Sequence, residues 1–446
     1  MKKILVVALT IIFMLGSLTS CLDNGVSTGD TTNEQTSQSD KTNNETTTAD
    51  TLESEETTTD TADIEQTEYT PGLVFTLINE NSAYSITNYT GTNTEVIIPS
   101  IYNGLPVIEV GEKAFYYHDS ITSVNIAYRI TSIGANAFEG CSALTSVTFG
   151  ENSQLTTIEK AAFYLCKALV DFDIPDGVEK IGEKAFYRCT SYTGIALPDS
   201  VICIEVDAFT GSGDYNNDDN WIGKIFYIGK HLIQSKKSIT QAEIRDGTVY
   251  IAQEAFNDRA LLGRVVFPES LKIIDRAAFA NCPWLSSIVL PDGLATLGDG
   301  AFAFCTQLAT INLPDSLTST GVYTFAACFA LTSIDIPDSI KIIDERAFVA
   351  CTALSKVNIG KDSQLESIGL YAFSECPITS IDIPIGVKNI GENAFNKCRY
   401  METINYSGTE AQWNEITKGL DWDIYAGSKT QNEKYTVVYN YEIPTE

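Results

Sequence analysis

Nine of the eleven cysteines share one recurring position, three residues after a phenylalanine, and thiols are the most reactive groups in this sequence. No Cys-x-x-Cys pair occurs, which argues against a zinc site. If the repeats stack, equivalent side chains point the same way, and that opposes the dihedral angle of a disulfide. We therefore expect buried, reduced thiols that pack as small apolar groups. The nine are Cys141, Cys166, Cys189, Cys282, Cys305, Cys328, Cys351, Cys376 and Cys398.

Other catalytic or metal-binding residue types are scarce. His118 and His231 are the only histidines, so sites that need several imidazoles have almost no residues to use. Residues 214–220 alternate Asp and Asn like the start of a calcium loop, but Asp219 and Ile225 replace the glycine and glutamate of that motif. This segment is typical of a polar surface turn. We expect no metal, no cofactor and no enzymatic activity, with a carboxylate-based hydrolase as an alternative.

The charge balance limits the classes of partner. The chain has 29 basic and 58 acidic residues among 446, a net charge of −29. Nucleic acid is disfavoured, because a phosphate backbone requires a positive surface to displace its counterions. Adsorption to an anionic membrane is disfavoured for the same reason. The apolar share of 44% is that of a folded globular protein, so most of the chain is expected to fold.

The N-terminus has the features of an export signal. Two lysines at positions 2 and 3 precede an apolar run from Ile4 to Leu18, which is too short for a transmembrane helix. The sequence Leu18-Thr-Ser-Cys21 resembles the lipobox of bacterial lipoproteins. That resemblance implies a signal peptide over residues 1–20 and a diacylglycerol on Cys21. Acyl chains anchor a protein to a membrane through the methylenes that they bury. A plain secretory signal is the alternative.

Residues 21–69 have the composition of a disordered tether. The stretch 22–70 holds nineteen Ser or Thr residues and thirteen acidic residues, with Lys41 as its only basic residue. Such a segment buries too little apolar surface to offset its chain entropy. Repulsion between like charges extends it further. We expect it to hold the folded part of an exported protein away from the bacterial membrane.

The rest of the chain repeats itself with a period of about 23 residues. Phenylalanine recurs with steps of 23, 25, 23, 23, 47, 23, 23, 23, 23, 25 and 22 residues, eleven times after alanine and once after threonine. A fixed period in the twenties predicts a solenoid. The 47-residue step indicates an insertion near 210–234. The twelve phenylalanines are Phe115, Phe138, Phe163, Phe186, Phe209, Phe256, Phe279, Phe302, Phe325, Phe348, Phe373 and Phe395.

Each repeat predicts one strand and one turn. In Leu308-Ala-Thr-Ile311-Asn-Leu313-Pro, apolar and polar residues alternate as in a strand with one buried face, and the proline ends it. The Ala-Phe-x-x-Cys segment is too short for a full helix and suits one helical or 3-10 turn. A single repeat cannot bury its apolar face alone, so neighbouring repeats are expected to stack into a continuous core.

The repeat pattern resembles the BspA-like class of bacterial leucine-rich repeats over about residues 84–406. Two motifs carry the resemblance, Ile181-Gly-Glu-Lys-Ala-Phe186-Tyr-Arg-Cys189 and Ile336-Pro-Asp-Ser-Ile340. It implies a leucine-rich repeat solenoid over residues 70–406, which begins with an N-terminal cap and has parallel strands on its concave face and short turns on its convex face. A C-terminal cap follows over residues 407–446. It also implies a surface protein that binds other proteins, including host matrix proteins.

The residues between the buried positions of the strands are the candidate binding residues. They are small, polar and mildly acidic, and they include no aromatic residue, which disfavours a sugar-binding groove. A solvated sheet face without a partner is the alternative, because small side chains also suit a crowded concave surface. The candidates are Ser123, Asn125, Ser146, Thr148, Asp171, Asp173, Thr310, Asn312, Ser333, Asp335, Lys356, Asn358, Ser380 and Asp382.

The insertion offers a second candidate patch. Residues 221–233 alternate like a hairpin with glycine at its turn. If the hairpin projects, Trp221, Phe226 and Tyr227 provide aromatic anchors of the kind that dominate protein interfaces. If it packs within the stack, it is only a spacer.

These features together predict a monomeric, lipid-anchored surface protein that faces the cell exterior and adheres to or captures a protein ligand. A carbohydrate-binding or polysaccharide-uptake component is the alternative from another functional class.

Overall fold

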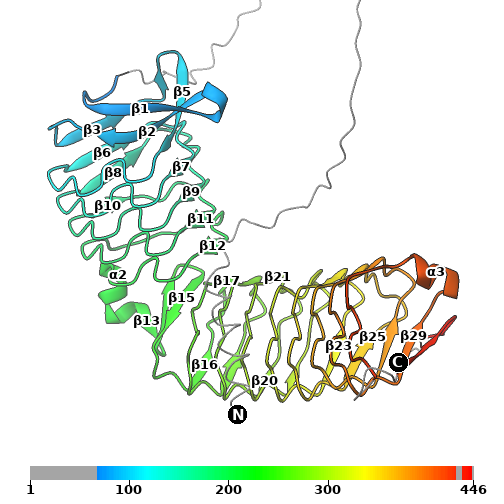
Figure 1. Ribbon diagram of the computed structural model, residues 1–446. Coiled ribbons are helices and arrows are strands. Elements are labelled where there is room, and N and C mark those ends of the chain that lie inside the picture. Colours follow the sequence, from blue (N-terminus) through cyan, green and yellow to red (C-terminus); the bar gives the residue numbers. More distant parts are fainter. Residues whose placement is uncertain (1–67, 428–433, 444–446) are drawn as a thin grey trace, which may run out of the picture.

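The computed structural model describes residues 68–427 and 434–443. The predicted signal peptide, Cys21 and the tether up to residue 67 lie outside the described residues. Among the residues described, no helix has the length and apolar character needed to cross a membrane. These residues form a solenoid of stacked coils that bends once near its middle (Figure 1).

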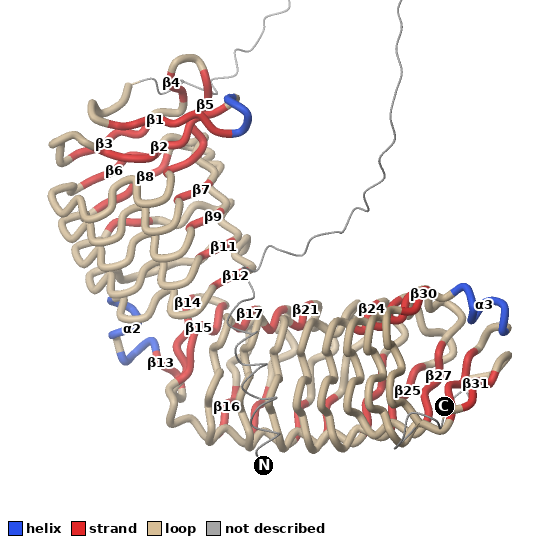
Figure 2. The backbone as a smooth tube through the Cα atoms, viewed as in Figure 1, coloured by secondary structure: helices blue, strands red, loops and turns tan. Residues whose placement is uncertain are grey.

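A regular coil contributes two short strands, which stack into parallel sheets along two sides of the solenoid (Figure 2). Ser123 pairs with Ser146, one period further along the chain, which confirms the predicted parallel-strand solenoid. The first strands are β3 (Glu95–Ile98), β6 (Ser123–Ile126), β8 (Ser146–Phe149), β10 (Asp171–Phe172), β16 (Gln241–Glu243), β18 (Arg264–Val266), β20 (Ser287–Ile288), β22 (Thr310–Ile311), β23 (Ser333–Ile336), β25 (Lys356–Ile359), β27 (Ser380–Ile383), β29 (Thr403–Tyr406) and β31 (Thr436–Val438). The second strands are β5 (Leu105–Val110), β7 (Ser132–Ile133), β9 (Thr157–Ile158), β11 (Lys180–Ile181), β12 (Cys203–Ile204), β17 (Tyr250–Ile251), β19 (Ile273–Ile274), β21 (Thr296–Leu297), β24 (Ile342–Ile343), β26 (Ser367–Ile368), β28 (Asn389–Ile390) and β30 (Thr417–Lys418).

The first strands form where apolar residues alternate with small polar ones. In β23, Ile334 and Ile336 are buried, whereas Ser333 and Asp335 are exposed. Pro337 follows at once and ends the strand, because it has no N–H to donate to the ladder. The sequence predicted this strand but not the second one, because two residues are too few to show alternation.

The Ala-Phe segment is a turn with two left-handed residues in each coil. In the coil of Phe115 they are Lys113, with φ of 57°, and Tyr117, with φ of 56°. The Phe115 N–H donates to the Ala137 carbonyl of the next coil at 2.7 Å, while the His118 N–H donates back to the Phe115 carbonyl at 3.1 Å. The turn therefore keeps the 3-10 type of hydrogen bond, but alternate N–H groups join neighbouring coils instead of continuing a helix.

The phenylalanines of these turns point into the core and stack on one another. They form two runs, from Phe115 to Phe209 and from Phe256 to Phe395, and every member is fully buried. Within the runs, neighbouring ring centroids lie 4.7–6.0 Å apart and the ring planes are nearly parallel. Such contacts add to the free energy gained from burial.

Aromatic residues close both ends of this stack. The ring centroid of Tyr89 in the N-terminal cap lies 5.5 Å from that of Phe115, and the ring centroid of Trp422 lies 6.1 Å from that of Phe395. β30 and β31 continue the two sheets beyond residue 406, so the last coil includes part of the expected C-terminal cap. The remaining cap elements are β1 (Leu73–Ile78), η1 (Asn79–Asn81), β2 (Ala83–Tyr89), β4 (Ile101–Tyr102) and α3 (Glu410–Glu415).

The bend coincides with the 47-residue step (Figure 1). It separates an N-terminal arm, residues 68–212, from a C-terminal arm made of the described residues after 235. β15 pairs in parallel with β17, so the insertion takes the place of a coil in the second-strand sheet. The elements of the insertion are α2 (Gly213–Asn216), η2 (Asp218–Asn220), β13 (Trp221–Ile222), β14 (Ile225–Ile228) and β15 (His231–Ser235).

Strand β14 is a wedge between the two arms, and all four of its residues are buried. Ile225 and Tyr227 belong to the core of the C-terminal arm, whereas Phe226 and Ile228 belong to the core of the N-terminal arm. Figure 1 shows the second strands on the inner side of the bend and the first strands on its outer side. We infer that the hairpin bends the solenoid because it adds bulk between the arms.

Hydrogen bonds hold the arms together at the second strands. The Gln253 N–H donates to the Ile204 carbonyl at 3.2 Å, and the Ile204 N–H donates to the Tyr250 hydroxyl at 2.7 Å. That hydroxyl in turn donates to the carboxylate of Asp275. Burial raises the pKa of Asp275 to about 6. The junction is therefore a packed, hydrogen-bonded contact.

Candidate binding surface

All fourteen candidate residues of the first strands are exposed or half-buried, while the residues between them, such as Val124 and Val357, are buried. Their side chains therefore face outward, as the alternation predicted. We call the surface that they form the first-strand face.

The bend divides the first-strand face between the two arms. Six candidates, from Ser123 to Asp173, lie on the N-terminal arm, and eight, from Thr310 to Asp382, lie on the C-terminal arm. Because the first strands lie on the outer side of the bend, the bend does not bring the candidates of the two arms together (Figure 1). The four aspartates of the candidate set therefore form two separate pairs, one on each arm.

Side chains on the first-strand face bond laterally from strand to strand. The Asn405 amide donates to the Asp382 carboxylate at 2.7 Å, and the Asn358 amide donates to the Asp335 carboxylate. On β22, the Thr310 hydroxyl bonds the Ser287 hydroxyl at 3.0 Å. The two amide hydrogen bonds restrict the Asp335 and Asp382 carboxylates, so less conformational entropy is lost when a partner binds to them.

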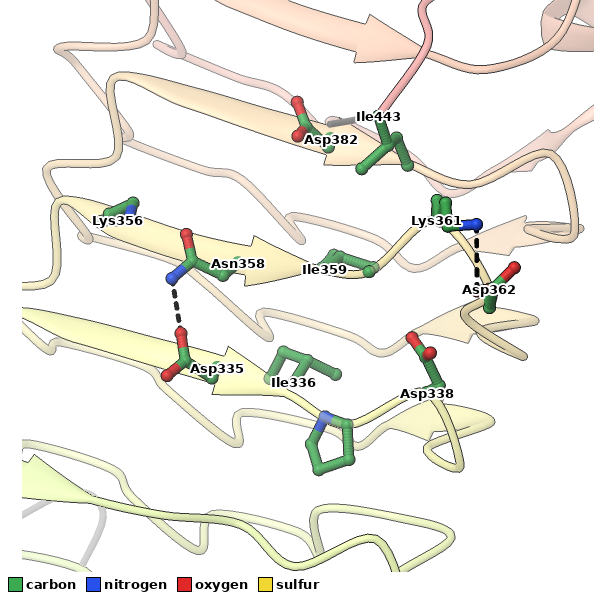
Figure 3. Close-up of a pocket in the computed structure, with 12 residues that line it drawn as sticks. Asp335, Ile336, Asp338, Lys356, Asn358, Ile359, Lys361, Asp362, Asp382 and Ile443 are labelled. Carbon is green, nitrogen blue, oxygen red and sulfur yellow. Dashed lines mark hydrogen bonds and ion pairs between the residues drawn. The ribbon is translucent and has the colours of Figure 1, made fainter. Parts of the chain in front are cut away.

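A groove of about 610 Å³ lies on the first-strand face of the C-terminal arm (Figure 3). Four candidate residues line it, namely Asp335, Lys356, Asn358 and Asp382. Its wall includes residues 359–362, which belong to the longer corner of one of the 25-residue steps. The candidate set did not include this corner, although its irregular length distinguishes it from the other repeats.

The groove is predominantly acidic. Asp335, Asp338 and Asp382 line it together with Lys356, while Lys361 and Asp362 form an ion pair at 3.5 Å on its wall. The lining therefore carries four carboxylates and two ammonium groups. Negative charge that is concentrated in a concave site attracts positively charged groups and accelerates their association.

The insertion does not present an aromatic patch. Phe226 is fully buried and Tyr227 is 6% exposed, so neither is available to a ligand. Trp221 is half-buried, where its indole N–H donates to the Tyr215 carbonyl at 2.8 Å and Lys236 lies over its ring. Of the two roles expected for the hairpin, the structure shows the spacer. The sequence could not separate the two, because alternation also arises when both faces of a hairpin are covered.

The nine repeated cysteines are free and buried. Each thiol donates a hydrogen bond to the phenylalanine carbonyl of the preceding coil, as Cys305 does to Phe279 at 3.2 Å and Cys141 to Phe115 at 3.1 Å. Burial raises the pKa of Cys141 to about 12. These thiols therefore link adjacent coils and are poor nucleophiles.

Residues 214–220 form a hydrogen-bonded turn. The Asn216 and Asn220 amides donate to backbone carbonyls, and the Asp214 carboxylate accepts N–H groups of the coil beside it. Within the described ranges, no three His, Cys, Asp or Glu side chains are grouped so that they could hold a metal ion.

Solved structures of several bacterial repeat proteins are similar to this chain. A leucine rich cell surface protein from Faecalibacterium prausnitzii is 27% identical, with 78% of this chain and 96% of that chain covered and a TM-score of 0.30. A leucine-rich repeat protein from Eubacterium ventriosum is 20% identical, with 73% of this chain and 93% of that chain covered and a TM-score of 0.39. The pneumococcal vaccine antigen PcpA is 15% identical, with 81% of this chain and 87% of that chain covered and a TM-score of 0.30.

No curated protein matches the chain. The pattern of the BspA type leucine rich repeat region matches it in six copies, over residues 108–218, 226–355 and 318–418. These ranges include most of both arms and leave out the two ends of the solenoid and the centre of the insertion. This chain therefore belongs to the BspA type leucine-rich repeat family.

Proposed function

We propose that this protein is an exported, lipid-anchored surface protein that binds a protein partner through the first-strand face of its C-terminal arm, without catalysis. The observation that carries the proposal is the groove lined by Asp335, Asn358 and Asp382. Lateral hydrogen bonds hold the Asp335 and Asp382 carboxylates, and stacked parallel strands support both residues. A partner with lysine or arginine side chains complements this surface.

A protein partner fits the groove better than a glycan does. Its lining residues include Ile336, Pro337 and Ile359 beside the charged groups, and no aromatic residue. Mixed apolar and charged surfaces are typical of protein interfaces. Sugar-binding sites commonly stack a pyranose ring on an aromatic side chain, and this groove does not supply one.

Reversing the charge of the groove tests the proposal. In a double variant, Asp335→Lys with Asp382→Lys, we expect association with a captured partner to slow about tenfold at low salt, because long-range attraction becomes repulsion. The difference is expected to shrink as ionic strength rises. Stability is expected to change by less than about 1 kcal/mol, because both substitutions are on the surface of the sheet, outside the core. Association rates of a partner isolated from candidate surface and matrix proteins, measured by surface plasmon resonance at several salt concentrations, provide the readout.

The matched control lies on the other arm. Asp171 and Asp173 are both exposed on the first-strand face of the N-terminal arm, away from the groove. Asp171→Lys with Asp173→Lys changes the net charge equally, but is expected to leave the on-rate within about twofold of the unaltered protein. Equal effects of the two variants would argue against the groove as the site.

The anchor is tested by replacing Cys21 with alanine. We expect the unaltered protein to partition into detergent, because acyl chains on Cys21 bury their methylenes in the membrane. The Cys21→Ala variant is expected to appear in the medium or to retain its signal peptide, as shown by fractionation and N-terminal mass spectrometry. Unchanged membrane retention of a processed Cys21→Ala protein would contradict the anchor.

A further inference from the structure

Strand β16 is the first strand of the C-terminal arm on the first-strand face, and one of its edges is open. It pairs in parallel with β18 along Gln241–Glu243. Among the residues described, no strand pairs with its other edge, because the bend and the hairpin interrupt the first-strand sheet there. Unpaired strand edges are templates for the addition of another strand.

The backbone groups of this edge point away from β18. The Thr240 carbonyl accepts the Gly263 N–H at 2.9 Å, and the Ile244 N–H donates to the Val266 carbonyl at 3.0 Å. Residues 240, 242 and 244 therefore direct their backbone groups toward β18. By the alternation of a strand, the N–H and carbonyl groups of Gln241 and Glu243 point to the open side.

The corresponding edge of the N-terminal arm is closed. The Asp214 carboxylate accepts the N–H groups of Gly194 and Ile195 at 3.0 and 2.8 Å, in the coil that follows β10. At the far end of the same arm, the Thr70 hydroxyl accepts the Ile97 N–H of β3 at 2.8 Å. At both ends of the N-terminal arm, a side chain thus accepts hydrogen bonds from the N–H groups of the sheet edge. The edge of β16 instead faces a groove.

This groove has a volume of about 430 Å³ and runs beside β16. Residues 222–225, from the end of β13 through the turn to the start of β14, also line it. Buried Ile225 and Ile239 line it together with Ile222, which is 48% exposed, and Val266, which is 38% exposed. An added strand would therefore have apolar contacts on one side of its backbone in addition to hydrogen bonds along one edge.

The charge around the groove is opposite to that of the whole protein. Lys224 and Arg264 line it, Lys237 lies next to it in the chain, and all three are exposed. Glu243 is the only acidic residue in its lining. A local excess of positive charge on a chain with a net charge of −29 favours acidic segments at this place.

We propose that the open edge of β16 binds an extended acidic segment of a partner protein by β-strand addition. Backbone hydrogen bonds to Gln241 and Glu243 hold the segment, its inward side chains contact Ile225 and Ile239, and its acidic side chains lie near Lys224 and Arg264. In this mode the main chain supplies affinity and alternate side chains supply specificity. The site is separate from the groove at Asp335 and Asp382 and does not depend on it.

A synthetic peptide tests the edge directly. The probe is a fluorescent ten-residue peptide in which valine and aspartate alternate, titrated into the protein at low salt and followed by fluorescence anisotropy. We expect saturable binding, and slower hydrogen exchange of the Gln241 and Glu243 amides in the complex. Two further versions of the peptide are N-methylated, one on every valine and the other on every aspartate. Only one of these two sets of N–H groups faces β16, so methylation of that set is expected to abolish binding and methylation of the other set to leave it unchanged.

Proline provides the matched pair of variants. Gln241→Pro removes the N–H that faces the open side and leaves the pairing with β18 intact, whereas Gln241→Ala keeps that N–H. We expect Gln241→Pro to weaken binding about tenfold or more, and Gln241→Ala to bind like the unaltered protein. Circular dichroism and thermal unfolding of both variants report whether they remain folded. Arg264→Glu is a second test if Gln241→Pro does not fold, and is expected to reverse the preference toward a peptide of alternating valine and lysine.

Three results would overturn the proposal. They are no binding to the unaltered protein, equal binding by Gln241→Pro and Gln241→Ala, or equal binding of both N-methylated peptides. The Asp335→Lys and Asp382→Lys variant is expected to bind the peptide normally, so failure at one site is distinguishable from failure at the other.

Discussion

Replacing Phe302 with alanine is expected to lower the free energy of unfolding by about 3–5 kcal/mol, the range for truncation of a large buried aromatic residue. Phe302 is fully buried, and its ring lies between those of Phe279 at 5.3 Å and Phe325 at 6.0 Å. The cavity therefore removes contacts with two other coils as well as with its own. Chemical denaturation of the purified protein measures the loss.

The damage is also expected to be local, because each coil contacts only its neighbours. Hydrogen exchange in Phe302→Ala should accelerate first in the coils of Phe279 and Phe325, and least in the N-terminal arm. Trp284→Ala is the matched control, because Trp284 is 58% exposed and its truncation is expected to cost less than about 1 kcal/mol. An equal loss in both variants would contradict the stack of buried rings.

The nine repeated thiols are expected to resist alkylation in the native protein. Burial raises the pKa of Cys141 and Cys282 to about 12 and that of Cys166 and Cys305 well above the usual value of a thiol. A rise of about three units lowers the thiolate fraction near neutral pH about a thousandfold, and the thiolate is the nucleophile. Burial also blocks the reagent. We therefore expect labelling by iodoacetamide at pH 8 to be at least about a thousandfold slower than in the denatured protein.

Mass spectrometry after timed labelling measures each of the nine sites separately. The denatured protein is the control, since the same thiols then react at the ordinary rate. Raising the pH toward 10 should accelerate native labelling of Cys141 and Cys282 little, because burial keeps the pKa of both thiols above that pH. Recovery of most of the nine as disulfides, or equal rates in the two states, would contradict the thiol–carbonyl hydrogen bonds.

The periodicity of the sequence by itself predicted the features that recur in every coil. The steps between phenylalanines predicted the solenoid, and alternation around each proline predicted which side chains face outward from the first strands. The position of cysteine three residues after phenylalanine predicted a buried column. These features depend on contacts that recur in every coil, so one period of sequence carries the information for each of them.

Only the tertiary structure decided the features that occur once. The hairpin of the insertion has the alternation of an exposed patch, yet Phe226 and Tyr227 are buried because a core lies on each side of β14. The same wedge separates Asp171 and Asp173 from Asp335 and Asp382, and it leaves the edge of β16 open. Sequence alternation reports that a strand has two faces, but not what covers each face or whether its edge is paired. Those are set by contacts between segments distant in the chain, which no repeat period encodes.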